Sequence, residues 1–125
     1  MMRLLERDND TICALATAHG LGAISVIRIS GNQAAKIIRK LAAFLPEKPE
    51  SHKIYYGIIR HPVSSEPLDE VLISYFAEGR SFTGEDSFEV SCHGSEIIVS
   101  EILSALVDAG ARPADRGEFT YRAFM

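Results

Sequence analysis

Five segments of the chain are rich in apolar, β-branched and aromatic residues, as is typical of β-strands, and in some of them the apolar residues recur at every second position. In the segment Ser87–His93, this alternation predicts that Phe88, Val90 and Cys92 face a core. Glu89 then belongs to the opposite side of the same strand. The predicted strands are 11–17, 23–30, 53–61, 70–76 and 87–93.

A period of three to four residues predicts helices between these strands. The first is expected to begin with a capping box of Ser30 and Gln33 and to run until Pro46, which cannot continue a helix. The second is expected over about 95–109, with Gly110 as the residue that ends it. The other segments are expected as loops at 46–52, 62–69 and 111–117, with a third helix from Glu118 onward.

The resulting order, β-β-α-β-β-β-α, predicts an α+β domain with a mixed, largely antiparallel sheet packed by helices. A chain of 125 residues with 46% hydrophobic residues fits a single domain, 1–125, with one core. The net charge of −4, with scattered lysines and arginines, argues against a large nucleic-acid-binding face.

The sequence also indicates the cellular compartment in which the protein is expected. Its start, MMRLLERDND, has no apolar region typical of a secretory signal, and no apolar run approaches the length of a membrane span. The two cysteines, Cys13 and Cys92, are too few for a disulfide framework and are expected in the core. A cytoplasmic, reduced protein without a membrane segment is therefore expected.

Arg28 and Glu89 are the candidate ligand-binding residues. A glutamate on a half-exposed strand is most often solvated surface, but a carboxylate on rigid backbone also suits recognition of a planar, donor-rich edge. Arg28 likewise admits two interpretations: an ion-pair partner on the strand face, even for Glu89 itself, or a ligand contact through its fork of donors. The residues alone leave these alternatives open.

Other combinations of reactive residues do not predict a site. Cys92 and His93 are adjacent on a predicted strand and point to opposite faces, and neither His52 nor His61 supplies a zinc-binding spacing. The 125 residues contain no G-x-x-x-x-G-K-[ST] motif, so nucleotide hydrolysis is not expected within them. No catalytic residue and no metal site are assigned.

Five blocks of sequence resemble, in the same order, the N-terminal domain of the MnmE (TrmE) family of tRNA-modifying GTPases. They read DTICALAT, ISVIRISG, DEVLISYF, FTGEDSFEVSCHG and GARPADRGEFTYRAF, and they cover most of the chain. The resemblance implies a folate-binding fold like one half of the glycine-cleavage aminomethyltransferase. Because the second half comes from a second chain in this family, it also implies a homodimer.

The resemblance further implies that the cofactor is 5-formyltetrahydrofolate or a related tetrahydrofolate, with Glu89 on the pterin and Arg28 on an anionic or carbonyl oxygen. The intact family protein acts at carbon 5 of the wobble uridine of tRNA with an MnmG (GidA)-like flavoprotein. GTP, magnesium and potassium belong to a GTPase domain, which together with a helical domain is expected outside this chain. The segment, which resembles an excised piece, is not expected to be catalytic alone.

Three positions depart from the family pattern. Leu21 replaces a loop arginine, Ser95 replaces a glycine and Arg116 replaces a proline, and a third folate-contacting lysine of the family falls beyond Met125. The departures motivate the alternative of a structural dimerisation module without folate. A stand-alone folate-dependent aminomethyltransferase relative is the other alternative.

Overall fold

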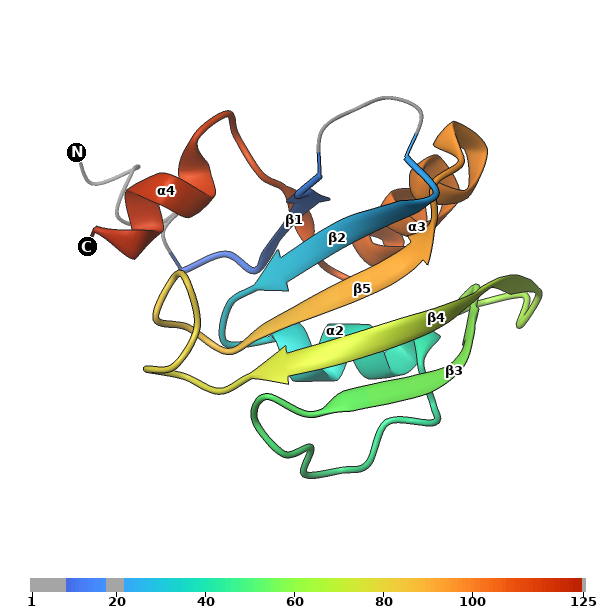
Figure 1. Ribbon diagram of the computed structural model, residues 1–125, viewed down its shortest axis with the longest axis horizontal. Helices are drawn as coiled ribbons and strands as arrows, with labels where there is room; N and C mark the ends of the chain where they lie inside the picture. The colour runs from blue at the N-terminus through green and yellow to red at the C-terminus, as the bar shows by residue number, and fades with distance from the viewer. Residues whose placement is uncertain (1–8, 18–21, 125) are drawn as a thin grey trace.

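In the residues that the computed structural model describes, 9–17 and 22–124, six strands form one mixed sheet in the order β3-β4-β5-β2-β1-β6 (Figure 1). The predicted α+β class is thereby confirmed. Within this described part, β1 pairs with β6 in parallel and the other neighbours are antiparallel. The strands are β1 (Ile12–Leu15), β2 (Ile24–Ser30), β3 (Ile54–Arg60), β4 (Pro67–Phe76), β5 (Ser87–His93) and β6 (Arg112–Pro113). The helices are α2 (Ala34–Leu41), α3 (Glu96–Asp108) and α4 (Glu118–Ala123).

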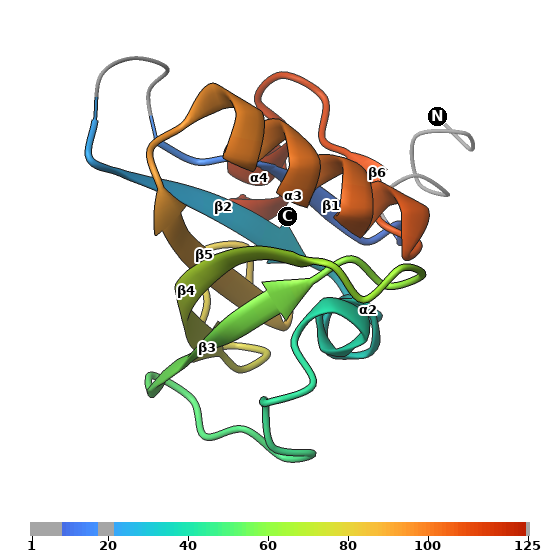
Figure 2. The same ribbon diagram turned by 90° about the vertical axis from the view of Figure 1, so that its right-hand side faces the viewer.

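The core lies between the sheet and the two longer helices, α2 and α3, which lie on the same side of the strands (Figure 2). Phe88, Val90 and Cys92 of β5 are buried, as their alternation predicts. Cys13 of β1 is buried in the same cluster. Burial raises the pKa of both thiols to about 11, so the two cysteines are protonated packing residues at neutral pH.

We call the side of the sheet away from α2 and α3 the open face. Its side chains belong to the alternate strand positions, and several are large, apolar and exposed. Leu72 of β4 is 47% exposed and Tyr56 of β3 is 58% exposed. The remaining exposed apolar residues of this face are Ile24, Ile54 and Ile58. The open face is therefore an incompletely covered hydrophobic surface.

The predicted capping box of α2 is wrong. Ser30 is the last residue of β2, and its fully buried hydroxyl is hydrogen-bonded to that of Ser87 on β5. Gln33 is the cap residue, without a side-chain cap bond. The Ser30 hydroxyl therefore bonds across the sheet and does not form the helix cap that the sequence pattern predicts. The helix also ends earlier than predicted, at Leu41.

The observed strands differ from the prediction most at β4, which is longer, at β1, which is shorter (Ile12–Leu15 and not 11–17), and at β6, which was not predicted. β4 starts at Pro67 and not at Glu70, which is compatible with proline because the first residue of a strand need not donate to the ladder. The expected loop 111–117 contains β6, whose Arg112 N–H donates to the Thr11 carbonyl at 2.8 Å. A strand of two residues carries no detectable alternation, so the sequence pattern could not reveal it.

Where the resemblance implies a pair of glycines at the end of β5, this chain has Gly94 and Ser95. Gly94 is required by a close backbone approach, since a Cβ there would lie 1.9 Å from the Gly22 carbonyl oxygen. Ser95 instead caps α3, its hydroxyl accepting a bond from the Ile98 N–H at 3.4 Å. Of the other departures, Arg116 is exposed before α4, and Leu21 lies outside the described residues.

Candidate functional site

Arg28 and Glu89 meet on the open face. They are directly opposite one another in the β2–β5 register. The Nε and Nη2 of Arg28 donate to Oε2 of Glu89 at 3.0 and 2.8 Å. The side chains are 23% and 29% exposed, so solvent reaches the pair. The ion-pair interpretation of Arg28 is therefore confirmed, with Glu89 as its partner.

The ion pair leaves binding capacity on both residues. Both bonds end on the same carboxylate oxygen. Within the described part of the chain, Oε1 of Glu89 accepts no hydrogen bond and Nη1 of Arg28 donates none. A charged acceptor and a charged donor thus lie side by side. This arrangement suits a planar ligand that carries donors and a carbonyl on one edge.

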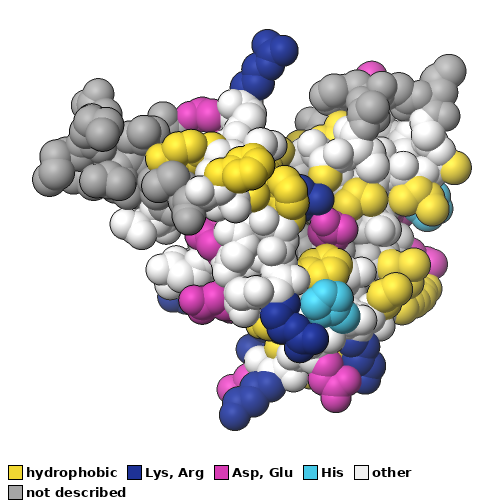
Figure 3. All heavy atoms as spheres, turned by 60° about the vertical axis from the view of Figure 1, so that its left-hand side comes forward, with side chains coloured by type: hydrophobic (Ala, Val, Ile, Leu, Met, Phe, Trp, Pro, Cys, Tyr) yellow, Lys and Arg dark blue, Asp and Glu magenta, His cyan; other side chains and the backbone are white. Residues whose placement is uncertain are grey.

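Two aromatic rings border the pair. The Arg28 guanidinium carbon lies 5.2 Å from the centre of the Phe82 ring and 5.5 Å from that of Phe119, within the range of cation–π contacts. Phe82 is 56% exposed, so one of the two rings is accessible to solvent. Figure 3 shows a basic and an acidic side chain next to one another between groups of hydrophobic side chains.

Neither phenylalanine is among the candidate residues that the sequence predicts. Both lie in blocks that carry the family resemblance, FTGED and GEFTYRAF, but they are far apart in the chain. Phe119 belongs to α4, and Phe82 to the loop between β4 and β5. The motifs identify these two segments as part of the family resemblance. The contact of both rings with Arg28 is a tertiary contact, which no local sequence pattern predicts.

Charged residues connect α4 with this loop. Arg122 donates to Glu85 at 3.1 Å and to Glu118 at 3.1 Å, and Arg112 of β6 donates to Glu118 at 3.0 Å. Burial opposes ionisation of Glu118, but the two arginines outweigh it and hold the pKa of its carboxyl below its usual value. Asp86, in the same loop, accepts a hydrogen bond from the Glu78 N–H at 2.7 Å.

His93 and Cys92 point to opposite sides of β5, as predicted. Cys92 is buried, whereas the His93 side chain is 69% exposed and its Nδ1 lies 2.7 Å from Asp69 Oδ1. Over residues 9–17 and 22–124 no group of three or more His, Cys, Asp or Glu side chains could hold a metal ion.

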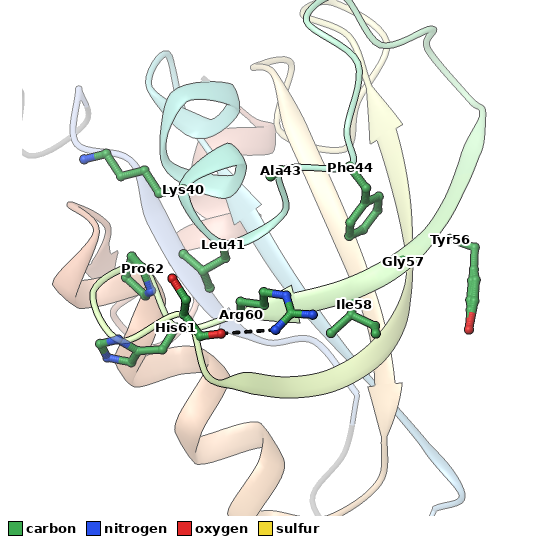
Figure 4. Close-up of a pocket in the computed structure, with 11 residues that line it drawn as sticks. Lys40, Leu41, Ala43, Phe44, Tyr56, Gly57, Ile58, Arg60, His61 and Pro62 are labelled. Atoms are coloured by element: carbon green, nitrogen blue, oxygen red, sulfur yellow. Dashed lines mark hydrogen bonds between the residues drawn. The ribbon is translucent and has the colours of Figure 1, made fainter.

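A separate groove of about 510 Å³ lies beside the edge strand β3 (Figure 4). Its cationic side chains are already engaged with backbone. Arg60 donates to the Ser65 carbonyl at 3.2 Å, and Lys40 donates to the Ala109 carbonyl at 3.0 Å. The groove does not include Arg28 or Glu89. We therefore place the candidate site at the ion pair, because a charged donor and a charged acceptor atom without a hydrogen-bond partner among the described residues lie there side by side.

Comparisons with known proteins agree with the resemblance. The family model described as "GTP-binding protein TrmE N-terminus" matches residues 11–125. A tRNA modification GTPase MnmE from Bdellovibrio bacteriovorus is 59% identical over 120 residues, which are 96% of this chain and 25% of that protein. An MnmE from Ligilactobacillus salivarius is 44% identical over 126 residues, covering 100% of this chain and 27% of that protein.

The chain spans about a quarter of the length of these curated relatives. None of the helices in the described residues is both long enough and apolar enough to cross a membrane. The match of the family model to nearly the whole chain, together with these identities, establishes the relationship. The chain belongs to the family of TrmE (MnmE) N-terminal domains.

Proposed function

We propose that this domain binds a tetrahydrofolate at the Arg28–Glu89 pair. The observation that carries the proposal is the partly exposed pair itself, in which, among the described residues, one carboxylate oxygen and one guanidinium nitrogen make no hydrogen bond, with two aromatic rings beside the guanidinium. The family resemblance, which implies folate contacts at the same two residues, supports it independently.

The chemistry of a reduced pterin fits this arrangement. Its amino group and neighbouring ring N–H form a planar donor edge, which a carboxylate can accept through charge-assisted hydrogen bonds. Glu89 would receive that edge at Oε1, while Nη1 of Arg28 would donate to a carbonyl or carboxylate oxygen of the ligand. Phe82, which is exposed, offers an apolar surface beside the ring.

Calorimetric titration of the 125-residue chain with 5-formyltetrahydrofolate tests the proposal. Saturable binding to the wild type is expected, and Glu89→Gln and Arg28→Ala should each weaken it by roughly 1.5–3 kcal/mol, the usual contribution of a charged hydrogen bond. Glu70→Gln is the matched control. Glu70 is an exposed carboxylate on the same face of the neighbouring strand β4, and it is bonded to the Tyr56 hydroxyl.

Circular dichroism of each variant should show an unchanged fold, because a partly exposed ion pair contributes little to stability. Equal binding by the wild type and by both site variants would contradict the assignment. A wild-type chain that binds nothing, also after extension to include the family lysine beyond residue 125, would leave the alternative of a structural dimerisation module.

The remaining roles concern the whole protein. We propose that this domain forms a homodimer, supported by the exposed apolar residues of the open face. The relatives are named as tRNA modification GTPases, so we propose that the intact protein modifies carbon 5 of the wobble uridine in the cytoplasm with an MnmG-like flavoprotein. GTP, with magnesium and potassium, would bind to a different domain.

A further inference from the structure

We propose that Arg122 is a positioning residue for the Arg28–Glu89 site, and that it acts by holding the two aromatic rings over Arg28. The ligand part of this inference rests on the proposed folate function. The geometric part concerns the protein alone and can be tested without ligand.

Arg122 is bonded to the two segments that carry the rings. Its Nη1 donates to both carboxylate oxygens of Glu85 at 3.1 and 3.3 Å, and its Nη2 donates to Glu118 at 3.1 Å. Glu85 follows Phe82 in the β4–β5 loop, and Glu118 directly precedes Phe119 in α4. The Arg122 guanidinium thus connects the two backbone segments that carry Phe82 and Phe119.

The rings themselves do not explain their own placement. Phe82 is 56% exposed, so burial cannot fix where it lies. α4 has only six residues, and a helix this short is not stable without tertiary contacts. The side chain of Arg122, by contrast, is 4% exposed and that of Glu118 is 8% exposed. The buried ionic contacts are therefore the rigid part of this side of the site.

A buried ion pair of this kind is weak evidence for a gain in stability, because desolvation offsets much of the attraction between the charges. The ion pair does fix the relative orientation of the segments that it joins, because the planar guanidinium of an arginine binds carboxylates only in restricted geometries. Loss of the Glu85 contact is accordingly expected to release the loop with Phe82 while leaving the sheet and its core folded.

The test is the side-chain Nε–H resonance of Arg28 in a ¹⁵N-labelled chain without ligand. Its proton shift in the wild type contains the ring currents of Phe82 and Phe119, and Phe82→Ala supplies the reference value without one ring. Glu85→Gln should move the resonance most of the way to that reference. Glu78→Gln, the same change in the same loop at a side chain that does not contact Arg122, should leave it in place.

Arg122→Lys keeps the charge but not the fork, so it should shift the Arg28 resonance in the same direction as Glu85→Gln. A folded Glu85→Gln chain with the wild-type Arg28 resonance would overturn the inference. In the second stage, Glu85→Gln should weaken binding of 5-formyltetrahydrofolate several-fold, with Glu78→Gln unchanged. If the resonance moves but neither the wild type nor any variant binds folate, also after extension beyond residue 125, the positioning role stands and the folate proposal fails.

Discussion

At the scale of single residues, the site depends on two side chains that leave adjacent antiparallel strands at opposed positions. Arg28 and Glu89 are joined across the β2–β5 ladder, and their exposure keeps solvent in contact with both. An ion pair of this exposure contributes at most about 1 kcal/mol to stability. Replacing either residue is therefore expected to leave the domain folded, and the role that we propose for the pair is in ligand recognition.

Glu118 is the residue whose ionisation should matter for stability. Its carboxyl is buried, but Arg112 and Arg122 lower its pKa from the usual 4.5. Because this pKa is lower in the folded state, the ionised carboxylate stabilises the fold fully above about pH 4.5, the pKa in the unfolded chain. This stabilisation is lost as the pH falls through the pKa of the folded state. Glu118→Gln should reduce the free energy of unfolding by roughly 2 kcal/mol at pH 7.

Urea unfolding at a series of pH values measures this effect. The difference between wild type and Glu118→Gln should shrink as the pH is lowered from 5 towards 3, because protonation removes the charge from the wild-type side chain. A difference that stays constant over this range would show that the charge of Glu118 is not what stabilises α4.

The sequence alone could predict where Arg28 and Glu89 stand but not what surrounds them. Strand alternation separates Glu89 from Phe88 and Val90, because the period of two is a local property. The contact of Arg122 with Glu85 joins residues 37 positions apart, and no local pattern determines it. The contacts of Phe82 and Phe119 with Arg28 could not be predicted for the same reason.

At the scale of elements, local signals predicted the long elements well and their ends poorly. β2, β5 and α3 agree with the pattern, and Gly110 follows α3 with a φ of 124°, as expected of a glycine that ends a helix. The errors arose where a tertiary partner competes with a local one. Ser30 pairs with Ser87 on the next strand and does not cap α2, and β6 exists only because β1 lies beside it.

Ser95 offers a prediction at this scale. As the cap of α3 it satisfies a backbone N–H that would otherwise lack a partner in the helix. Ser95→Ala should lower the free energy of unfolding by about 1 kcal/mol, whereas Ser95→Gly, the residue usual in the family, should cost only a few tenths. Urea denaturation of the three proteins measures the effect. Equal losses for alanine and glycine would show that the hydroxyl has no capping role.

At the scale of the whole molecule, the sheet is packed on one side and incompletely covered on the other. The charged network of α4 lies near one end of the open face, and exposed apolar residues occupy the strands towards β3. A monomer rarely leaves such a surface uncovered. A second copy of the chain is the partner that we propose for it.

Leu72 tests this proposal, since it is exposed on the open face at 47%. Burying a charge in an apolar interface is costly, so Leu72→Glu should weaken the dimer at least tenfold, about 1.4 kcal/mol. Sedimentation equilibrium measures the dissociation constant. Val63→Glu, at an exposed apolar residue in the β3–β4 loop, is the control and should leave it unchanged. A dimer that tolerates Leu72→Glu would contradict an interface on the open face.

An NMR titration of the ¹⁵N-labelled chain with 5-formyltetrahydrofolate tests whether a tetrahydrofolate binds at the ion pair. The Arg28 Nε–H resonance and the backbone amide resonances of Arg28 and Glu89 should shift together and follow a single saturation curve. Shifts confined to the groove beside β3 would contradict this, as would the absence of shifts at any concentration, also after extension of the chain to include the family lysine beyond residue 125.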